Sequence, residues 1–431
     1  MQWLLQFLNR HRHTHWALAD QTVVSGSNFV TGILLARFLG PESFGIFVLL
    51  QAIILYMNSF QGALIFQPMM SAAPQLREDQ RIHYMHGAFA LQLMLCSVLI
   101  GIIAIAATVI HVFDLYSMLS IDSHIITAVI AAMLAFQLHD WQRRYYFVKE
   151  KAGAAFLIDI ISHGGQVTLL GAAFLLDKLD VAMAFWIIAG TSFTAFIVGF
   201  MRDSLSPVFS HAKKVLRDGW RTGRDYLVAW QLQWLGTQGV LMFSAGVVGA
   251  EAVGGIRAAQ NIVGPINILF LAMENVVPVI AAKKFGISGL KGLLSYLSRI
   301  TLIGSALLIP VLITVTVFAS PIMKMLYGES YVGSASLVIW QVGSVFLQFY
   351  LRQVFFFLRT LAATGVIIKT GAVMSITAVL ITLFTVNQYH EIAIMAALLL
   401  GTAAGLIYAM AAAFKIMRKL QLEANRMESM P

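Results

Sequence analysis

Apolar runs of about 20 residues recur along the whole chain, separated by short polar or charged segments. A run of that length crosses the hydrocarbon core of a bilayer as an α-helix. A membrane barrel would show short alternating strands instead. The pattern predicts an all-α polytopic membrane protein with twelve spans, at 15–38, 43–70, 83–110, 121–142, 152–176, 180–201, 225–248, 251–282, 292–319, 332–358, 361–386 and 391–414.

Composition supports the same class. Of 431 residues, 59% are hydrophobic and only 11% are charged, whereas soluble proteins carry roughly a quarter charged residues. The single cysteine, Cys96, excludes an intrachain disulfide. The first thirteen residues have apolar positions ahead of Arg10 and Arg12, the reverse of a cleaved signal, and predict a short amphipathic surface helix.

The net charge is +9, and the basic residues follow a topological pattern. Loops with many Lys and Arg residues lie on the cytoplasmic side, which predicts that both termini are cytoplasmic and makes a nucleic-acid partner unnecessary. The residues concerned follow spans 2, 4, 6, 8 and 10 and include Arg77, Arg81, Arg143, Arg144, Lys149, Lys151, Arg202, Lys213, Lys214, Arg217, Arg221, Arg224, Lys283, Lys284, Lys291, Arg359 and Lys369.

The longest connection, 203–223, combines apolar residues at helical spacing with four basic residues. This pattern predicts an amphipathic helix on the inner leaflet. It divides the chain into an N-lobe at 1–202 with spans 1 to 6, and a C-lobe at 224–431 with spans 7 to 12. The structural alternative is that this segment is simply a linker.

A short motif recurs between the halves at an offset of 209 residues. The turn after span 1 has a glycine suited to a left-handed helix end and, two residues on, a glutamate at the start of the next helix. Six spans per half give both halves the same orientation, which predicts two pseudo-symmetric lobes around a central cavity. The matching residues are Gly40 with Gly249, Glu42 with Glu251, Gly45 with Gly254, and Gln51 with Gln260.

The stretch from Asn28 to Phe47, NFVTGILLARFLGPESFGIF, resembles the start of Wzx-type polysaccharide flippases. These belong to the multidrug/oligosaccharidyl-lipid/polysaccharide (MOP) exporter superfamily. The twelve spans, the 6+6 repeat, the central linker and the length agree with the resemblance. It implies an alternating-access transporter that moves an undecaprenyl-diphosphate-linked oligosaccharide, a precursor of surface polysaccharide, from the cytoplasmic to the outer leaflet of the bacterial inner membrane.

Ionisable residues inside the spans are costly in hydrocarbon and therefore mark candidate sites. Arg37, Arg257 and Arg352 are candidates for binding the diphosphate, because guanidinium groups can bind phosphate oxygens in a bidentate way. Arg37 could instead anchor the outer turn. Arg299 and Arg359 lie near the cytoplasmic ends of their spans, where they can extend to the inner surface.

Intramembrane acids are candidates for coupling to H⁺ or Na⁺: Asp20, Asp159 and Glu274. His163 follows Asp159 by four residues, so the two share a helix face and could relay a proton. The alternative is an interhelical hydrogen bond that only holds the N-lobe together. Asp140, beside Arg143 and Arg144, is predicted to form an interfacial ion pair.

Polar side chains gather on spans 1, 2, 7 and 8, which are therefore predicted to line the cavity. Amides of this kind bind sugar hydroxyls, and the candidates are Asn28, Gln51, Gln260 and Asn261. No GxxxxGK[ST] phosphate loop occurs, so ATP hydrolysis is not expected. The histidines at 11–15 are interpreted as an interfacial segment, and neither a metal nor another cofactor is expected.

The leading hypothesis is thus a flippase and not an enzyme. Its expected partners are the lipid-linked oligosaccharide, membrane lipids and the machinery that polymerises or exports polysaccharide, and it is expected to act as a monomer. A drug/cation antiporter of the MATE type in the same superfamily is the nearest alternative. A membrane-embedded glycan ligase or polymerase is a further one, although the outer loops at 111–120 and 320–331 are short for such a site.

Overall fold

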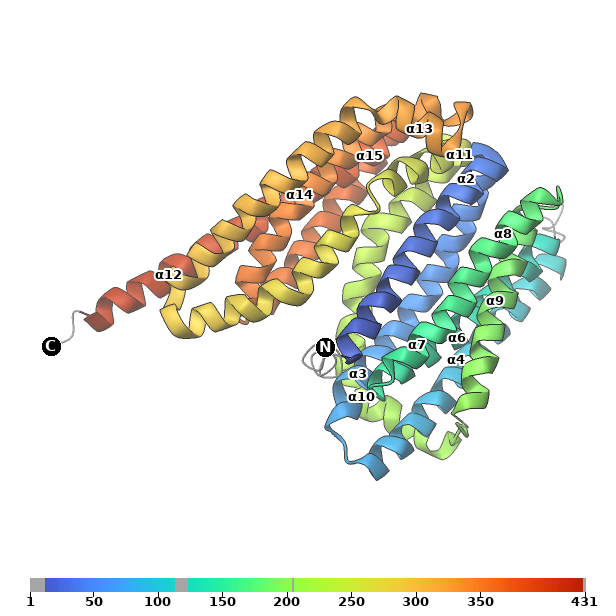
Figure 1. Cartoon of the computed structure of the whole chain (residues 1–431), viewed down its shortest axis with the longest axis horizontal. Helices are drawn as coiled ribbons and strands as arrows, with labels where there is room; N and C mark the ends of the chain where they lie inside the picture. Colours follow the sequence, from blue (N-terminus) through green and yellow to red (C-terminus); the bar gives the residue numbers. More distant parts are fainter. Residues whose placement is uncertain (1–11, 113–122, 204, 429–431) are drawn as a thin grey trace, which may run out of the picture. The chain divides into compact units, whose positions relative to one another are not determined.

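A computed structural model describes residues 12–112, 123–203 and 205–428. The first eleven residues, for which a surface helix is predicted, lie outside this range. All regular elements of the described residues are helical (Figure 1). In order they are α2 (Arg12–Gln61), η1 (Gly62–Phe66), α3 (Gln67–Ala72), η2 (Ala73–Gln75), α4 (Glu78–Val112), α6 (Ser123–Val148), α7 (Ala152–Asp159), η3 (Ile160–Gly164), α8 (Gly165–Leu175), α9 (Val181–Arg202), α10 (Phe209–Trp234), η4 (Leu235–Gly239), α11 (Val240–Ile262), α12 (Ile266–Val317), α13 (Ala319–Tyr327), η5 (Glu329–Ser334), α14 (Ala335–Thr360) and α15 (Thr364–Glu428).

Nine helical segments among the described residues are long and apolar enough to cross a membrane. Four of them, 52 to 59 residues long, exceed a single crossing more than twofold. Each contains a break in helical geometry, at Gly40, Gly249, Ser288–Gly289 and His390. Dividing the four long segments at these breaks gives thirteen pieces in all. When the two pieces on either side of the turn at 263–265 are counted as one span, the result matches the twelve predicted spans in order.

The breaks at Gly40 and Gly249 have the same backbone conformation. Gly40 has φ 77° and ψ 172°, and Gly249 has φ 82° and ψ 166°. The predicted left-handed helical conformation is therefore wrong in ψ, because both residues are extended at positive φ, a region that essentially only glycine occupies. The repeat in the sequence thus corresponds to the same backbone conformation in both halves.

Contacts divide the chain into a first unit, Met1–Trp230, and a second unit, Gln231–Pro431. The boundary lies beyond the predicted linker at 203–223, because α10 packs closely on the first unit as far as Trp230. A Cβ added to Gly62 would lie 1.9 Å from the ring of Trp230, and one added to Gly219 would lie 2.7 Å from Pro68. From Gly219 to Trp230, α10 is therefore packed on α3 and η1.

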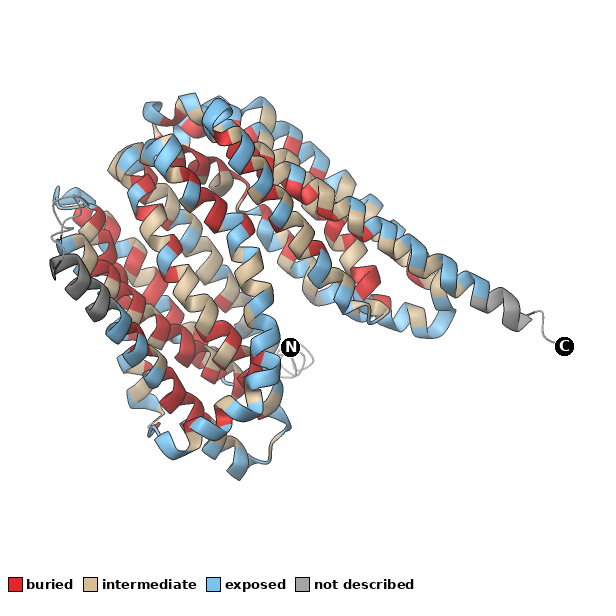
Figure 2. Ribbon diagram, turned by 180° about the vertical axis from the view of Figure 1, so that it is seen from behind, coloured by how far each residue is buried: buried red, intermediate tan, exposed pale blue. Residues whose placement is uncertain are grey.

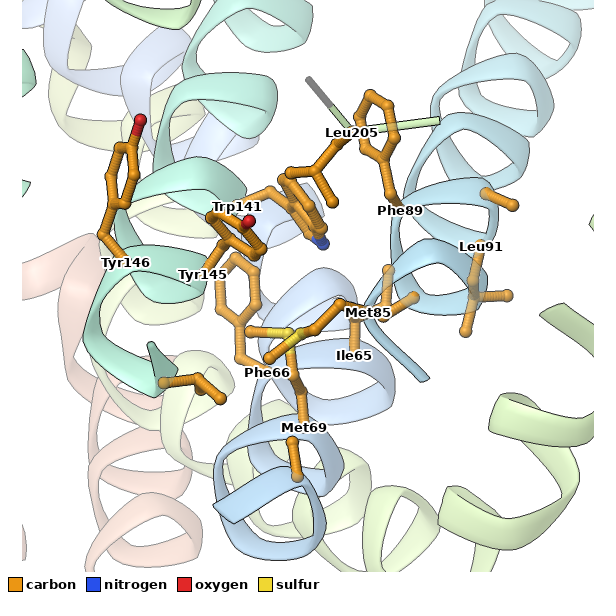
Figure 3. Close-up of a cluster of buried hydrophobic side chains, with 14 of the residues drawn as sticks. Ile65, Phe66, Met69, Met85, Phe89, Leu91, Trp141, Tyr145, Tyr146 and Leu205 are labelled. Carbon is orange, nitrogen blue, oxygen red and sulfur yellow. The ribbon is translucent and has the colours of Figure 1, made fainter. Parts of the chain in front are cut away.

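Each unit has its own apolar core, and buried positions lie on the helix faces turned inward within a unit (Figure 2). In the first unit, α6 supplies Trp141, Tyr145 and Tyr146, which are at most 1% exposed and belong to one cluster with Phe89 and Met69 (Figure 3). In the second unit, Phe270 of α12 packs near Phe349 of α14, with ring centroids 6.4 Å apart. These cores position the charged residues described next.

Candidate functional site

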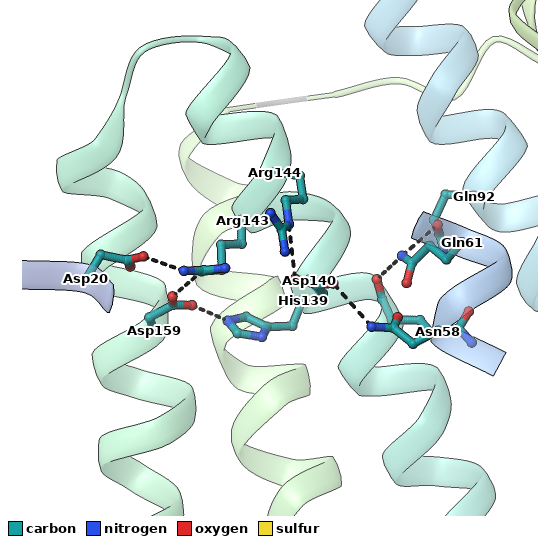
Figure 4. Close-up of polar contacts among 10 residues, drawn as sticks. Asp20, Asn58, Gln61, Gln92, His139, Asp140, Arg143, Arg144 and Asp159 are labelled. Carbon is teal, nitrogen blue, oxygen red and sulfur yellow. Dashed lines mark hydrogen bonds and ion pairs between the residues drawn. The ribbon is translucent and has the colours of Figure 1, made fainter. Parts of the chain in front are cut away.

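A buried charge cluster lies in the first unit, where α2, α6 and α7 meet (Figure 4). Arg143 of α6 donates from Nη2 to Asp20 Oδ2 at 2.6 Å and from Nε to Asp159 Oδ2 at 2.5 Å. Both carboxylates are 0% exposed. One guanidinium therefore bridges two buried acids from different helices.

Local packing explains why these acids meet. Trp16 of α2 lies against Phe156 of α7, with ring centroids 5.0 Å apart. Asp20 is one turn beyond Trp16, and Asp159 is about one turn beyond Phe156, so the aromatic contact brings the acids to neighbouring positions. The π-helical segment η3 begins directly after Asp159. Such segments in α-helices are frequent at functional sites.

Two histidines extend the cluster. His139 is one turn before Arg143 on α6, and its Nε2 lies 3.0 Å from Asp159 Oδ1. The rings of His139 and His163 are 6.0 Å apart and nearly perpendicular, and both side chains are buried. The predicted Asp159–His163 face is thus turned inward, but the histidine at ion-pair distance from Asp159 is His139.

The sequence interpretation missed Arg143 and His139 as members of this site. It ended span 4 at residue 142 and assigned Arg143 to a cytoplasmic loop, which is wrong because α6 continues to Val148. The available signal was the spacing of His139 and Arg143, four residues apart on one helix face. That face also carries the buried Gln142 one residue before Arg143.

Asp140 forms the predicted ion pair, with Arg144 and not with Arg143. Its Oδ1 lies 3.6 Å from Arg144 Nε, and its Oδ2 accepts from Asn58 Nδ2 at 3.4 Å. Arg144 also lies over the ring of Phe66 at 5.6 Å. These long contacts make a looser group than the Arg143 cluster beside it.

A neutral polar group lies among α2, α4 and α6. Gln61 donates to Gln92 Oε1 at 2.8 Å and to the backbone carbonyl of Gln137 at 2.7 Å. Gln92 in turn donates to the buried thiol of Cys96 at 3.3 Å. Interhelical amide bonds of this kind hold membrane helices together, and η1 begins directly after Gln61.

In the second unit, Arg352 of α14 pairs through Nη1 with Glu274 Oε1 of α12. Its guanidinium also lies over the ring of Phe270, 4.7 Å from the centroid. The side chains of Arg352 and Glu274 are 28% and 32% exposed. This pair is therefore accessible, unlike the Arg143 cluster.

Arg257 lies elsewhere in the second unit, on the part of α11 that follows Gly249. Its Nη1 is 3.5 Å from Gln260 Oε1, and it is half-buried. Asn261 follows Arg257 by one helical turn on α11. Burial raises the pKa of Tyr327, and Asn261 and Arg257 oppose that shift. Within the described part of the chain, Arg257 forms no ion pair with a carboxylate.

The structure thus brings several predicted site residues together within each unit. Asp20 joins Asp159, Glu274 joins Arg352, and Arg257 joins Gln260 and Asn261. Three predicted residues of the first unit stay apart from the charge cluster. Asn28 and Arg37 are exposed, and Gln51 is half-buried. Among the described residues, no group of three His, Cys, Asp or Glu side chains could hold a metal ion.

Known proteins share this fold. An inward-facing multidrug resistance MATE family transporter of the MOP superfamily is 13% identical, with a TM-score of 0.72, covering 96% of this chain and 100% of that chain. The lipid II flippase MurJ, in an inward closed conformation, is 10% identical with a TM-score of 0.66, covering 91% and 86%. A MOP superfamily transporter from Pyrococcus furiosus, described as having a binding pocket of reverse polarity, is 14% identical with a TM-score of 0.57, covering 93% and 94%.

These TM-scores show that the chain shares the all-α fold of these proteins. No curated protein matches the sequence. A family model does, and it covers residues 12–284, more than half of the chain. The chain therefore belongs to the polysaccharide biosynthesis protein family.

Proposed function

We propose that this protein is a flippase for a lipid-linked oligosaccharide. It moves an undecaprenyl-diphosphate-linked precursor from the cytoplasmic to the outer leaflet of the bacterial inner membrane by alternating access, with both termini in the cytoplasm. Support comes from the family, whose description is polysaccharide biosynthesis, and from a fold shared with a lipid II flippase.

The observation that carries the proposal is the unneutralised Arg257. A guanidinium in a membrane span without a carboxylate partner is costly and calls for an anionic ligand. A diphosphate supplies that anion and matches the donor geometry of arginine. Gln260 and Asn261, beside Arg257, add amide groups that can bind sugar or phosphate oxygens.

The same observation disfavours a MATE-like antiporter of cationic drugs. The fold does not separate the two functions, because it is shared with both kinds of transporter. Charge separates them: among the residues that the structure describes, Arg257 has no carboxylate partner, and it would repel a cationic substrate. A glycan ligase or polymerase would need a sizeable outer loop or domain to build its site, and the outer loops at 111–120 and 320–331 are short.

Transport by the purified protein in proteoliposomes tests this function. The substrate is the lipid-linked oligosaccharide extracted from the bacterium that encodes the chain, and its arrival in the opposite leaflet is followed by accessibility to a glycosidase. Arg257→Gln should slow transport at least about tenfold, since a charge-assisted contact to phosphate is lost. The matched control is Arg224→Gln, which removes an exposed arginine paired with its neighbour Asp225 and should leave the rate unchanged.

Deletion of the gene gives an independent test. The lipid-linked glycan should accumulate in the cytoplasmic leaflet, and the surface glycan should disappear. Normal surface glycan in the deletion strain would refute the flippase function. Mass spectrometry of lipids retained by the purified protein would identify the glycan itself.

We further propose that the first unit couples transport to protons. In a closed core, the two carboxylates of Asp20 and Asp159 share the single guanidinium of Arg143, which leaves one negative charge in excess among these three groups. One added proton neutralises the group. Sodium fits less well, because hard cations need several oxygen ligands and Arg143 already occupies the space between the two carboxylates.

The coupling proposal is tested by imposing a proton gradient and, separately, a sodium gradient across proteoliposomes. The wild-type protein should respond to the proton gradient alone, and Asp159→Asn should remove that response. Asp203→Asn is the matched control, since it alters an acid that pairs with Lys151 at the end of α9. A response to sodium, or an unchanged proton response in Asp159→Asn, would refute the assignment.

A further inference from the structure

The guanidinium of Arg352 is held on two sides and is incompletely bonded. Nη1 contacts Glu274, and the ring of Phe270 covers one face at 4.7 Å. Nε is buried, and within the described chain it has no hydrogen-bond partner. The pair with Glu274 is therefore monodentate, although arginine and a carboxylate can form two parallel bonds.

The support of this pair is buried, whereas its charged ends are partly exposed. Phe270 and Glu274 lie four residues apart on α12, so both face α14. Phe270 is 1% exposed and packs near Phe349, which is one turn before Arg352. The side chains of Glu274 and Arg352 are 32% and 28% exposed, which leaves room for a ligand to reach them.

A second positive charge lies on the same side of α14. Arg359 follows Arg352 by seven residues, two helical turns, and is exposed. Glu274 neutralises one of these two arginines. If the carboxylate moved away, the remaining charge of +2 would match a diphosphate.

We propose that Glu274 is a displaceable internal anion that occupies a second diphosphate position, on Arg352, separate from the one proposed at Arg257. In the empty transporter its carboxylate neutralises the guanidinium while Phe270 fixes the guanidinium plane. The incoming diphosphate takes over Nη1 and also bonds the free Nε. The carboxylate returns to Arg352 when the substrate leaves. This role rests on the proposed flippase function, since it requires a diphosphate ligand.

The chemistry of competition explains why a transporter would keep such a residue. Phosphate and carboxylate oxygens accept from the same N–H groups, so each weakens the binding of the other. A transporter must release its substrate, and Arg352 without its carboxylate partner would hold a diphosphate more tightly. Glu274 therefore lowers affinity and accelerates release.

Binding of farnesyl diphosphate to the full-length protein in nanodiscs provides the test. Wild-type protein should bind this probe, and Arg352→Gln should weaken binding at least about tenfold. Glu274→Gln should tighten binding about tenfold and slow dissociation by a similar factor, because the competing charge is gone. Glu329→Gln makes the same chemical change at an exposed residue paired with Lys324 and should leave binding unchanged.

The outcomes separate the two proposals. If wild-type protein does not bind the probe, the diphosphate function fails, and the role of Glu274 fails with it. If wild-type protein binds and Arg352→Gln weakens binding, but Glu274→Gln leaves it equal or weaker, only the role of Glu274 is refuted. Should Glu274→Gln not fold, Glu274→Asp keeps the charge but shortens its reach, and it should still tighten binding.

Discussion

The two units hold intramembrane arginines in opposite ways. In the first unit, Arg143 is 11% exposed and lies between two acids that are 0% exposed. In the second unit, Arg352 has one acid partner, and both side chains are about a third exposed. The same residue types therefore form a closed cluster in one unit and an open pair in the other.

This difference indicates what each arrangement can exchange. A closed cluster excludes a large anion, but it can still gain or lose a proton, because proton binding requires no cavity. An open pair admits a phosphate group, and a partner that bonds through one atom only is readily displaced. The contrast agrees with the proposals of ion coupling in the first unit and substrate binding in the second.

The largest expected effect is the difference in stability between the variants that lack Arg143 and Arg352. Arg143→Gln leaves two buried carboxylates without their counter-charge and should lower the free energy of unfolding by about 3–5 kcal/mol. Arg352→Gln removes a partly exposed pair and should cost about 1 kcal/mol or less. Thermal unfolding of both variants in the same detergent measures the difference.

A second substitution can test whether unpaired charge causes the instability of Arg143→Gln. Adding Asp20→Asn to Arg143→Gln removes one unpaired charge and should recover part of the lost stability. Equal destabilisation by Arg143→Gln and Arg352→Gln would contradict the distinction between a closed cluster and an open pair.

A smaller effect should appear equally in both units, at their shared breaks. Gly40→Ala and Gly249→Ala each force a Cβ into the extended positive-φ region, at an expected cost of about 1–3 kcal/mol. An added Cβ meets nothing within 4 Å at either site, so the cost is purely conformational. Unfolding of the two variants should therefore shift by the same amount.

The matched controls are Gly26→Ala and Gly246→Ala. These glycines also have open space around an added Cβ, but they have helical backbone. Alanine there should stabilise by about 0.5–1 kcal/mol. If Gly40→Ala lowers the free energy of unfolding and Gly249→Ala does not, the two breaks do not have the same conformational requirement, although their sequences are related.

The sequence predicted the fold well because apolar length and the motif around Gly40 are local signals. A membrane span appears in the sequence as a stretch of apolar residues, and a glycine between two such stretches indicates a helix break. The value of ψ at Gly40 was not predictable in this way, because it depends on the direction in which the next helix leaves.

The charge cluster was predictable only in part. Asp20 and Asp159 were identified because an acid inside a hydrophobic run is costly and therefore marks a candidate site. Arg143 was missed because a basic residue at the end of a run can equally extend to the membrane surface. The contact with Asp20, 123 residues away in sequence, decides between the two, and hydrophobic periodicity carries no information about that contact.

The smallest expected effect concerns Arg144, the neighbour of Arg143. Its side chain is 35% exposed and lies 3.6 Å from Asp140, so Arg144→Gln should cost only about 0.2–1 kcal/mol. The two substitutions are chemically identical and one residue apart on α6, and they differ in enclosure. A cost for Arg144→Gln near that of Arg143→Gln would mean that the number of charges, and not their enclosure, determines stability in this unit. The expected large gap would show that enclosure makes the Arg143 cluster distinct.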